Sequence, residues 1–246
     1  MKIICLGVGE AFDENLPNNS HLVITEATKL LLDCGMTAAP QVWKFNSDPN
    51  LLDAVYISHW HADHYFGLPG LLLRMWADGR TREITIISRV GFKNQFTKLM
   101  DLAYDGFLEK FKFKINIIET EEYIIFNDLK LSFNRTIHSG ENWAIKINDS
   151  KNTIIYSGDG SPVTDNDFYK NTDLFISETY LYDEEKIGHF SITSAINFAE
   201  GNNIKCLALT HMNRDFRKNE FLKMKDKIKS DKVKIIIPDL LDEYNL

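Results

Sequence analysis

Ser-His-Trp-His-Ala-Asp-His, residues 58–64, places three histidines and an aspartate within six consecutive positions of a chain that has seven histidines in all. The run follows an apolar stretch at 54–58 and precedes a helical pattern, so His59, His61 and His64 are expected on a strand-to-helix loop. Imidazole nitrogens on such a loop can converge on a metal ion, and Asp63 adds an oxygen ligand. A loop of hydrogen-bonded surface histidines is the alternative, but this density of ligand side chains favours a metal site.

Strand and helix patterns alternate on both sides of this run. Short apolar stretches bounded by turn residues predict strands at 2–6, 21–25, 29–32, 54–58, 84–88, 115–119, 129–135, 143–147, 153–156, 174–177, 206–209 and 234–237. Amphipathic spacing predicts helices at 38–45, 67–77, 93–104, 191–200 and 219–228. Several strands precede the first long helix, and strand, helix and strand recur near the end. This order is expected when two sheets pack face to face with helices outside.

The composition limits the partners that the protein can have. With 44% hydrophobic and 26% charged residues, and no linker-like or repeated segment, the 246 residues predict a single domain over 1–246. The net charge of −7 disfavours long nucleic acid as the main partner, because phosphate-backbone affinity comes from clustered basic residues. A lysine-rich stretch at 223–229 is interleaved with acidic residues, which predicts a solvated helix face.

The compartment is predicted from two further features. The apolar start of the chain is too short for a secretory signal, and no stretch approaches the ~20 apolar residues of a membrane span, so we expect no membrane partner. Cys5, Cys34 and Cys206 are odd in number and lie in apolar runs, which predicts buried free thiols. Both features favour the cytoplasm.

The motif at 59–64 resembles the His-x-His-x-Asp-His signature of the metallo-β-lactamase superfamily. Further landmarks of that superfamily follow the same order along most of the chain. The resemblance implies an α+β fold, the four-layer αββα metallo-β-lactamase sandwich, and a metal-dependent hydrolase. The matching residues are Asp33 as the early structural aspartate, His138 and His211 as later metal ligands, and Asp159 as a bridging carboxylate.

The same resemblance implies two divalent metal ions, Zn²⁺ or alternatively Mn²⁺. One ion is expected on His59, His61 and His138, and the other on Asp63, His64 and His211, with Asp159 bridging them. Ions ~3.5–4 Å apart can activate a water molecule and neutralise a phosphate oxygen. Taken alone, His138 and His211 would be interpreted as core histidines. Their assignment as metal ligands depends on the superfamily landmarks occurring together and in the same order along this chain.

A further histidine, His189, indicates the class of substrate. His189, which follows Glu178 and precedes His211, resembles the additional histidine of the ribonuclease Z branch. There it would protonate the leaving oxygen of a phosphodiester, with Glu178 orienting it, because an alkoxide leaves poorly without an acid. The alternatives are a histidine that only hydrogen-bonds locally beside the helix cap Ser191, and a solvated strand-end carboxylate at Glu178.

The interval between His138 and Asp159 is too short for the tRNA-binding arm of ribonuclease Z. Only two predicted strands and a polar turn at 148–152 fill it. Together with the acidic charge, this favours a small nucleotide substrate. The layout resembles cyclic-nucleotide phosphodiesterases such as the phage anti-Pycsar enzymes, which destroy cyclic pyrimidine monophosphates of bacterial immunity, more than the cyclic-ribose phosphodiesterases of phosphonate metabolism. Relatives of this branch are commonly homodimers, so a homodimer is expected.

For a cyclic mononucleotide, the predicted mechanism has a metal-activated water attack phosphorus. Asp63 is expected to accept the proton of that water, and His189 to protonate the departing ribose oxygen. Five aromatic residues are candidates for contacting the base, although a core position is the default for each: Trp60, Tyr65, Phe66, Tyr104 and Phe107. The segment 101–113 is expected to be a core-facing helix and strand, with a lid or a dimer contact as the alternative.

Three other functions remain open from the sequence. A lactonase or thioester hydrolase on the same fold would use the metal ligands but leave His189 without a role. A ribonuclease Z-like RNA endonuclease would need a basic track beside the metals. A non-catalytic nucleotide-binding protein would not need the complete ligand set. A dinucleotide-binding loop at Gly7 and Gly9 is excluded, because Phe12 occupies the third glycine position.

Overall fold

Two mixed sheets form the centre of the molecule. A computed structural model describes residues 1–119, 122–163, 167–184 and 186–246. In these residues the first sheet has the order β15-β1-β2-β3-β4-β5-β6. Its strands are β1 (Lys2–Gly7), β2 (Ser20–Ile24), β3 (Lys29–Leu32), β4 (Ala54–Tyr56), β5 (Ile84–Ser88), β6 (Ile115–Glu119) and β15 (Glu243–Asn245).

The second sheet has the order β11-β8-β9-β10-β12-β13-β14, and β7 pairs with β8 beside this path. Its strands are β7 (Ile124–Phe126), β8 (Leu129–Ile137), β9 (Trp143–Asn148), β10 (Thr153–Tyr156), β11 (Ser161–Pro162), β12 (Leu174–Glu178), β13 (Cys206–Thr210) and β14 (Lys234–Ile236). Each sheet joins an antiparallel part to a parallel part.

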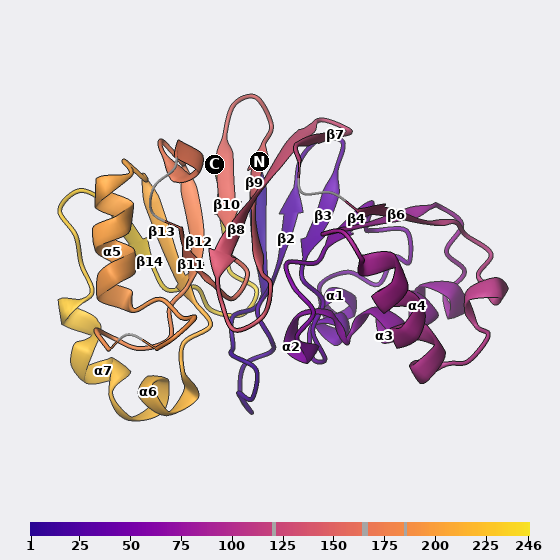
Figure 1. The fold of residues 1–246 in the computed structure, drawn as a ribbon, viewed down its shortest axis with the longest axis horizontal. Coiled ribbons are helices and arrows are strands. Elements are labelled where there is room, and N and C mark those ends of the chain that lie inside the picture. Colours follow the sequence, from indigo (N-terminus) through magenta and orange to yellow (C-terminus); the bar gives the residue numbers. More distant parts are fainter. Residues whose placement is uncertain (120–121, 164–166, 185) are drawn as a thin grey trace.

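Helices cover the outer face of each sheet. The first sheet carries α1 (Ala39–Phe45), α3 (Leu68–Ala77) and α4 (Phe92–Ala103), and the second lies beside α5 (Ile192–Gly201), α6 (Arg214–Asn219) and α7 (Phe221–Met224) (Figure 1). The short helix α2 (Ala62–Tyr65) follows β4. The arrangement is the four-layer αββα sandwich that the sequence predicted.

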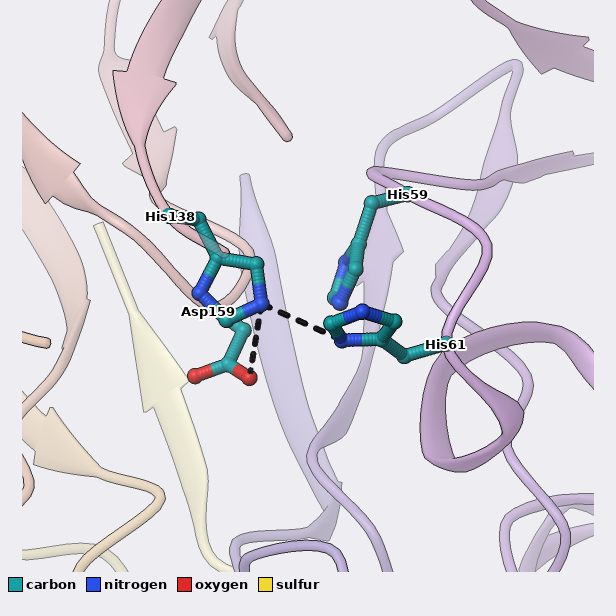
Figure 2. A group of neighbouring side chains, drawn as sticks. All are labelled: His59, His61, His138 and Asp159. Carbon is teal, nitrogen blue, oxygen red and sulfur yellow. Dashed lines mark hydrogen bonds and ion pairs between the residues drawn. The ribbon is translucent and has the colours of Figure 1, made fainter. Parts of the chain in front are cut away.

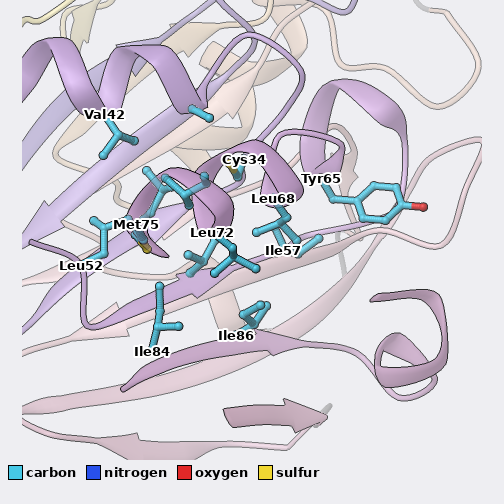
Figure 3. Packing of buried hydrophobic residues seen from close by; sticks show 14 of the residues in the cluster. Cys34, Val42, Leu52, Ile57, Tyr65, Leu68, Leu72, Met75, Ile84 and Ile86 are labelled. Atoms are coloured by element: carbon cyan, nitrogen blue, oxygen red, sulfur yellow. The ribbon is translucent and has the colours of Figure 1, made fainter. Parts of the chain in front are cut away.

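Three buried clusters hold the layers together. Leu68, Leu72 and Met75 of α3 pack on Ile84 and Ile86 of β5 (Figure 3). The neighbouring residue of β5, Ile87, belongs instead to the cluster between the two sheets, because successive side chains of a strand point to opposite faces. The third cluster packs α5 and α6 on the second sheet. Strands buried on both faces need continuous apolar runs, which is why they were recognisable in the sequence.

Most of the strand predictions are confirmed, four of them with the same bounds: 29–32, 84–88, 115–119 and 153–156. The single helix predicted at 219–228 is confirmed only in part, as α7 and a 3₁₀ turn over 221–227. The side chain of Asn213 accepts hydrogen bonds from Asp215 N and Phe216 N, so α6 begins at Arg214 and ends at Asn219, and only the short α7 and a 3₁₀ turn follow. The lysines of 223–229 are exposed, as predicted, but do not share one helix.

Two further predictions need correction. The segment 101–113 is not a core-facing helix and strand: α4 ends at Ala103, Leu102 is 88% exposed, Tyr104 is 55% exposed, and only Phe113 is buried. Cys5 and Cys34 are buried free thiols, but Cys206 is only partly buried. Among the described residues, no helix combines the length and the apolar character needed to cross a bilayer.

The buried imidazole of His21 on β2 predicts an acid sensitivity of the fold. Burial lowers the pKa of His21 to about 3, against an unfolded value of ~6.5. Below pH 6.5 the unfolded chain therefore binds a proton that the folded chain does not, so stability falls as the pH falls. Between pH 7 and pH 5 the wild type should lose about 2 kcal/mol more unfolding free energy than His21→Gln in urea titrations. Parallel pH profiles of the two proteins would contradict this prediction.

Candidate metal centre

The first half of the chain supplies four of the candidate ligands from one short segment. His59 and His61 directly follow β4, while Asp63 and His64 lie in α2, which the sequence had placed on an irregular loop. This helix packs closely on the end of β3, where Cys34 N donates to His64 O at 2.8 Å. A Cβ on Gly35 would lie 1.8 Å from Asp63 O, so only glycine permits this approach.

The second half supplies the remaining ligands from the ends of three strands. His138 follows β8, Asp159 lies shortly after β10, and His211 follows β13. Gly158, with φ of +65°, turns the chain just before Asp159, and a Cβ there would lie 2.3 Å from Asn142 Oδ1. The structure thus brings all seven predicted ligands to one edge of the two sheets.

The first donor set consists of His59, His61, His138 and Asp159, whose ligand atoms lie within 4.8 Å of one another. His138 Nε2 is 3.1 Å from His61 Nδ1 and 3.5 Å from Asp159 Oδ2. Figure 2 shows the three imidazoles and the carboxylate turned toward a common space. The other ring nitrogen of His138 faces Gly188 O at 3.2 Å, which fixes the orientation of the ring.

The second donor set consists of Asp63, His64, Asp159 and His211. Asp63 Oδ2 lies 3.2 Å from His64 Nε2 and 3.5 Å from His211 Nε2. Asp159 belongs to both sets, and its oxygens face ligands of both. Its Oδ2 faces His138 Nε2 of the first set at 3.5 Å, and its Oδ1 faces His211 Nδ1 of the second set at 3.2 Å.

The donor atoms of both sets fit divalent metal ions. Buried polar atoms almost always have hydrogen-bond partners, yet several atoms that face this space have none among the described residues. Imidazole and carboxylate donors in this number suit borderline divalent ions such as Zn²⁺ and also Mn²⁺, so the chemistry leaves the choice of metal open. The unpartnered atoms are His59 Nε2, His64 Nε2, His211 Nδ1 and Nε2, and Asp159 Oδ1.

The pKa values of His59 and Asp63 agree with metal ligation, whereas the neighbouring carboxylates outweigh burial and raise the pKa values of His64 and His211. Burial lowers the pKa of His59 well below its usual range, and the neighbouring His64 adds to this effect. Burial raises the pKa of Asp63, but His64 and His211 outweigh it and hold that pKa well below normal. A neutral imidazole and an ionised carboxylate are the protonation states in which these side chains bind metals.

Asp33 fixes the ligands from behind, in the structural role that the sequence predicted. Its fully buried carboxylate accepts hydrogen bonds from Ser58 N and Oγ, both at 2.7 Å, from His64 Nδ1 at 2.7 Å and from Tyr156 OH at 2.6 Å. Donation from His64 Nδ1 leaves Nε2 free to face a metal ion. Ser58 Oγ also lies 3.0 Å from His59 Nδ1, so Asp33 orients two ligands.

Asp33→Asn should therefore weaken metal binding without removing a ligand. The amide group would meet donors where the carboxylate accepts, so we expect the affinity for Zn²⁺ to fall by about 10- to 100-fold and the unfolding free energy to fall by about 1–3 kcal/mol. Competition with a fluorescent chelator measures the affinity. An affinity equal to that of the wild type would show that Asp33 does not orient His64.

His189 and Glu178 form a third group beside Asp159. His189 Nδ1 lies 3.4 Å from Asp159 Oδ1 and 3.5 Å from Glu178 Oε2. Burial lowers the pKa of His189, but contacts with these two carboxylates outweigh it and raise the pKa to about 10. The ring stacks on Tyr180 with centroids 4.5 Å apart. His189 is thus held between two carboxylates and an aromatic ring at the edge of the metal site.

Glu178 is buried, so the alternative of a solvated strand-end carboxylate is wrong. It accepts a hydrogen bond from Phe190 N, next to His189. Ser191 does cap α5, accepting from Ser194 N at 3.1 Å, but the cap does not occupy His189, which faces the carboxylates. Burial raises the pKa of Glu178 above its usual value.

The donor sets open into a cavity of about 420 Å³. Its described lining contains none of the five aromatic residues proposed to contact a base. Tyr65 is buried in the outer core, and Trp60 packs under Arg89 with 3.4 Å between the guanidinium carbon and the ring centroid. Besides the donors, the lining contains side chains that the sequence reasoning did not assign to the site: Glu10, Ala11, Phe12, Met36, Ala62, Ser139 and Tyr180.

Comparisons with known proteins agree with this fold and site. Ribonuclease Z of Methanocaldococcus jannaschii is 26% identical over an alignment that covers 100% of this chain and 97% of that protein. Matches to two further ribonucleases Z span 32% and 42% of those proteins. The crystal structure of the metallo-β-lactamase fold protein YhfI from Bacillus subtilis has a TM-score of 0.81 at 24% identity, covering 99% of this chain and 98% of that one.

The structure of human tRNase Z, short form, has a TM-score of 0.82 at 21% identity and covers 100% of this chain and 99% of that one. These neighbours establish the metallo-β-lactamase fold. The family model described as anti-Pycsar protein Apyc1 matches residues 1–230. The chain therefore belongs to the anti-Pycsar protein Apyc1 family, a family of metal-dependent hydrolases with the metallo-β-lactamase fold.

Proposed function

We propose that the protein is a two-metal phosphodiesterase that hydrolyses a small phosphodiester, a cyclic mononucleotide. One observation carries the proposal: two donor sets that share Asp159 lie next to His189, whose Nδ1 faces the carboxylates of Asp159 and Glu178. Hydrolysis of a phosphodiester needs both of these features. The metal ions would neutralise charge at the phosphate, and His189 would supply the acid for a poor leaving group.

The residues divide this work. His59, His61 and His138 would hold one ion, Asp63, His64 and His211 the other, and Asp159 would join them. Bound divalent ions supply an activated water and neutralise charge on the phosphate oxygens. Asp63, whose pKa is held low, stays ionised and accepts a proton from the attacking water. His189 donates its proton to the departing ribose oxygen, and buried Glu178 holds the ring in place.

The shortness of the chain segment between His138 and Asp159 supports a small substrate. All of its residues are described, and they form β9, the turn at 149–152 and β10, without an arm that could grip a tRNA. The cavity of about 420 Å³ falls in the range of small-molecule sites. The net charge of −7 also works against a long polyanion.

The family match supports cyclic pyrimidine mononucleotides as the substrates, since the matching model is described as an anti-Pycsar protein and the sequence resembles the phage enzymes that destroy these immune signals. In that role a phage would encode the enzyme, and it would act in the cytoplasm of the infected cell. A cytoplasmic location and a homodimeric state remain predictions.

A panel of esters tests the proposed chemistry. Protein loaded with Zn²⁺ or Mn²⁺ is incubated with bis-p-nitrophenyl phosphate, 3′,5′- and 2′,3′-cyclic mononucleotides, a lactone and a thioester. We expect cleavage of the phosphodiesters and a clear preference for 3′,5′-cyclic mononucleotides. Cleavage confined to the lactone or the thioester would refute a phosphodiesterase.

A ribonuclease Z-like RNA endonuclease is the second candidate, because the similarity to a ribonuclease Z extends over the whole chain. This candidate predicts processing of a labelled tRNA precursor by the same metal-loaded protein. The missing arm and the acidic charge make the cyclic mononucleotide the better-supported substrate.

A further inference from the structure

The loop between β1 and β2 is anchored to α6 at the mouth of the metal site. Residues 10–14, here called the anchored loop, carry three acidic side chains, and each pairs with a basic residue of α6. Glu10 lies 2.8 Å from Arg214, Asp13 lies 2.5 Å from Arg217, and Glu14 pairs with Lys218. Segments more than two hundred residues apart in the sequence are thereby joined.

The carboxylates of two of these anchors are buried, while their arginine partners are 34% and 25% exposed, which sets the pairs apart from fully exposed ion pairs of small effect. The side chains of Glu10 and Asp13 are 3% and 0% exposed. They also organise the loop itself: Glu10 Oε2 accepts from Phe12 N at 3.0 Å, and Asp13 Oδ1 accepts from Asn15 N at 2.9 Å. Desolvating two carboxylates is unfavourable unless they are paired in this way. A mere connection between two strands needs no such anchoring.

The anchoring fixes one exposed aromatic ring. Phe12 is 73% exposed, although it lines the same cavity as His61, Asp63 and Asp159. Met36, 47% exposed, is the other exposed apolar side chain of the described lining. A large apolar ring held in water at the rim of a polar metal site gains stability when a flat partner covers it.

We propose that Phe12 is the base-stacking residue of the site and that Met36 provides a second apolar contact for the nucleobase. The inference rests on the proposed function, because the phosphodiester at the metal donors places the remainder of a nucleotide in the same cavity. Aromatic stacking recognises the presence of a base more than its identity, since every base has a π face. Methionine adapts to irregular surfaces and makes favourable contacts with aromatic rings.

Kinetics of Phe12 variants test the proposal. Phe12→Ala should raise KM for 3′,5′-cyclic CMP by roughly 5- to 100-fold, the usual effect of losing one stacked ring, while kcat changes by less than about two-fold. Phe12→Trp should keep a low KM. A base-free analogue, methyl riboside 3′,5′-cyclic phosphate, should be cleaved equally by the wild type and Phe12→Ala.

Tyr123→Ala is the matched control. Tyr123 is 65% exposed and has a cation over its ring, Lys130 Nζ at 5.0 Å from the centroid, as Phe12 has the Arg214 guanidinium carbon at 5.8 Å. Tyr123 does not line the metal cavity. Its removal should leave both kinetic constants unchanged. An unchanged KM for cyclic CMP in Phe12→Ala, with the wild type active, would overturn the stacking role and leave the proposed function standing.

A binding measurement separates the two proposals when turnover fails. Calorimetry of the Zn²⁺-loaded protein compares cytidine 5′-monophosphate with ribose 5-phosphate, which lacks the base. We expect tighter binding of the nucleotide in the wild type and in Tyr123→Ala, and loss of that preference in Phe12→Ala. Equal affinities in the wild type, or a preference that survives in Phe12→Ala, would overturn the stacking role whether or not cyclic nucleotides are cleaved.

Discussion

Asp159→Asn is expected to lower phosphodiester turnover by about 10³-fold or more. This carboxylate contacts ligands of both donor sets: Oδ1 faces His211, and Oδ2 faces His138 and, at 4.0 Å, His64. Asparagine keeps one oxygen and replaces the other with an amide that cannot bind a cation. Loss of one ion removes several kcal/mol of transition-state stabilisation, and each 1.36 kcal/mol is tenfold in rate.

The metal content of the purified Asp159→Asn variant is measured together with its turnover rate. The wild type should carry about two ions per chain and the variant no more than about one. Chelation of the wild type should abolish turnover and lower the melting temperature, because an ion that binds only the folded chain stabilises it. Asp167→Asn, a change at an exposed aspartate paired with Lys170, is the control. Full metal content and normal turnover in Asp159→Asn would contradict the bridging role.

His189→Gln is expected to lower kcat for a cyclic mononucleotide by about 10²- to 10⁴-fold, the usual range for removal of a general acid. The metal content should not change, because His189 lies beside the donor sets and belongs to neither. The leaving group provides a sharper test. p-Nitrophenolate leaves without protonation, so cleavage of bis-p-nitrophenyl phosphate should fall far less than cleavage of the cyclic nucleotide.

Two variants complete this comparison. Glu178→Gln keeps the size of a side chain that contacts His189 at 3.5 Å, and it should lower kcat by an intermediate factor, about 10- to 100-fold, because the imidazole loses its orienting charge. His21→Gln changes a buried histidine away from the cavity and should leave kcat unchanged. Equal losses of His189→Gln on both substrates would argue against an acid and for a structural role of the histidine.

The metal donors could be predicted from the sequence because their chemistry depends on local residue identity. Four of them lie in one motif, whereas His138, Asp159 and His211 follow separate strands and could be assigned only because the whole set resembles the superfamily pattern. The strands were predictable for a related reason: those buried between two layers must be apolar throughout. The strands β7, β11 and β15 were not predicted, because a strand of two or three residues is too short to show a periodic pattern. Only the strands that they pair with define them.

The walls of the cavity could not be predicted, because distant segments build them. Phe12 reaches the site only because Glu10 and Asp13 bind α6, and nothing in the local pattern links residues 10–14 to residues 214–218. Trp60 and Tyr65, which the sequence did suggest, lie in or beside the motif but pack in the outer core and do not line the cavity. The signal present was a lone phenylalanine in an otherwise acidic and polar loop.

Phosphorus NMR of 3′,5′-cyclic CMP with the metal-loaded protein is the most direct measurement of the proposed activity. The signal of the cyclic phosphodiester should disappear and be replaced by that of a single nucleoside monophosphate, and the conversion should require both added metal and His189. The same preparation should leave a tRNA precursor intact. An unchanged cyclic signal, together with cleavage of the tRNA precursor, would contradict a cyclic-mononucleotide phosphodiesterase and establish the RNA endonuclease instead.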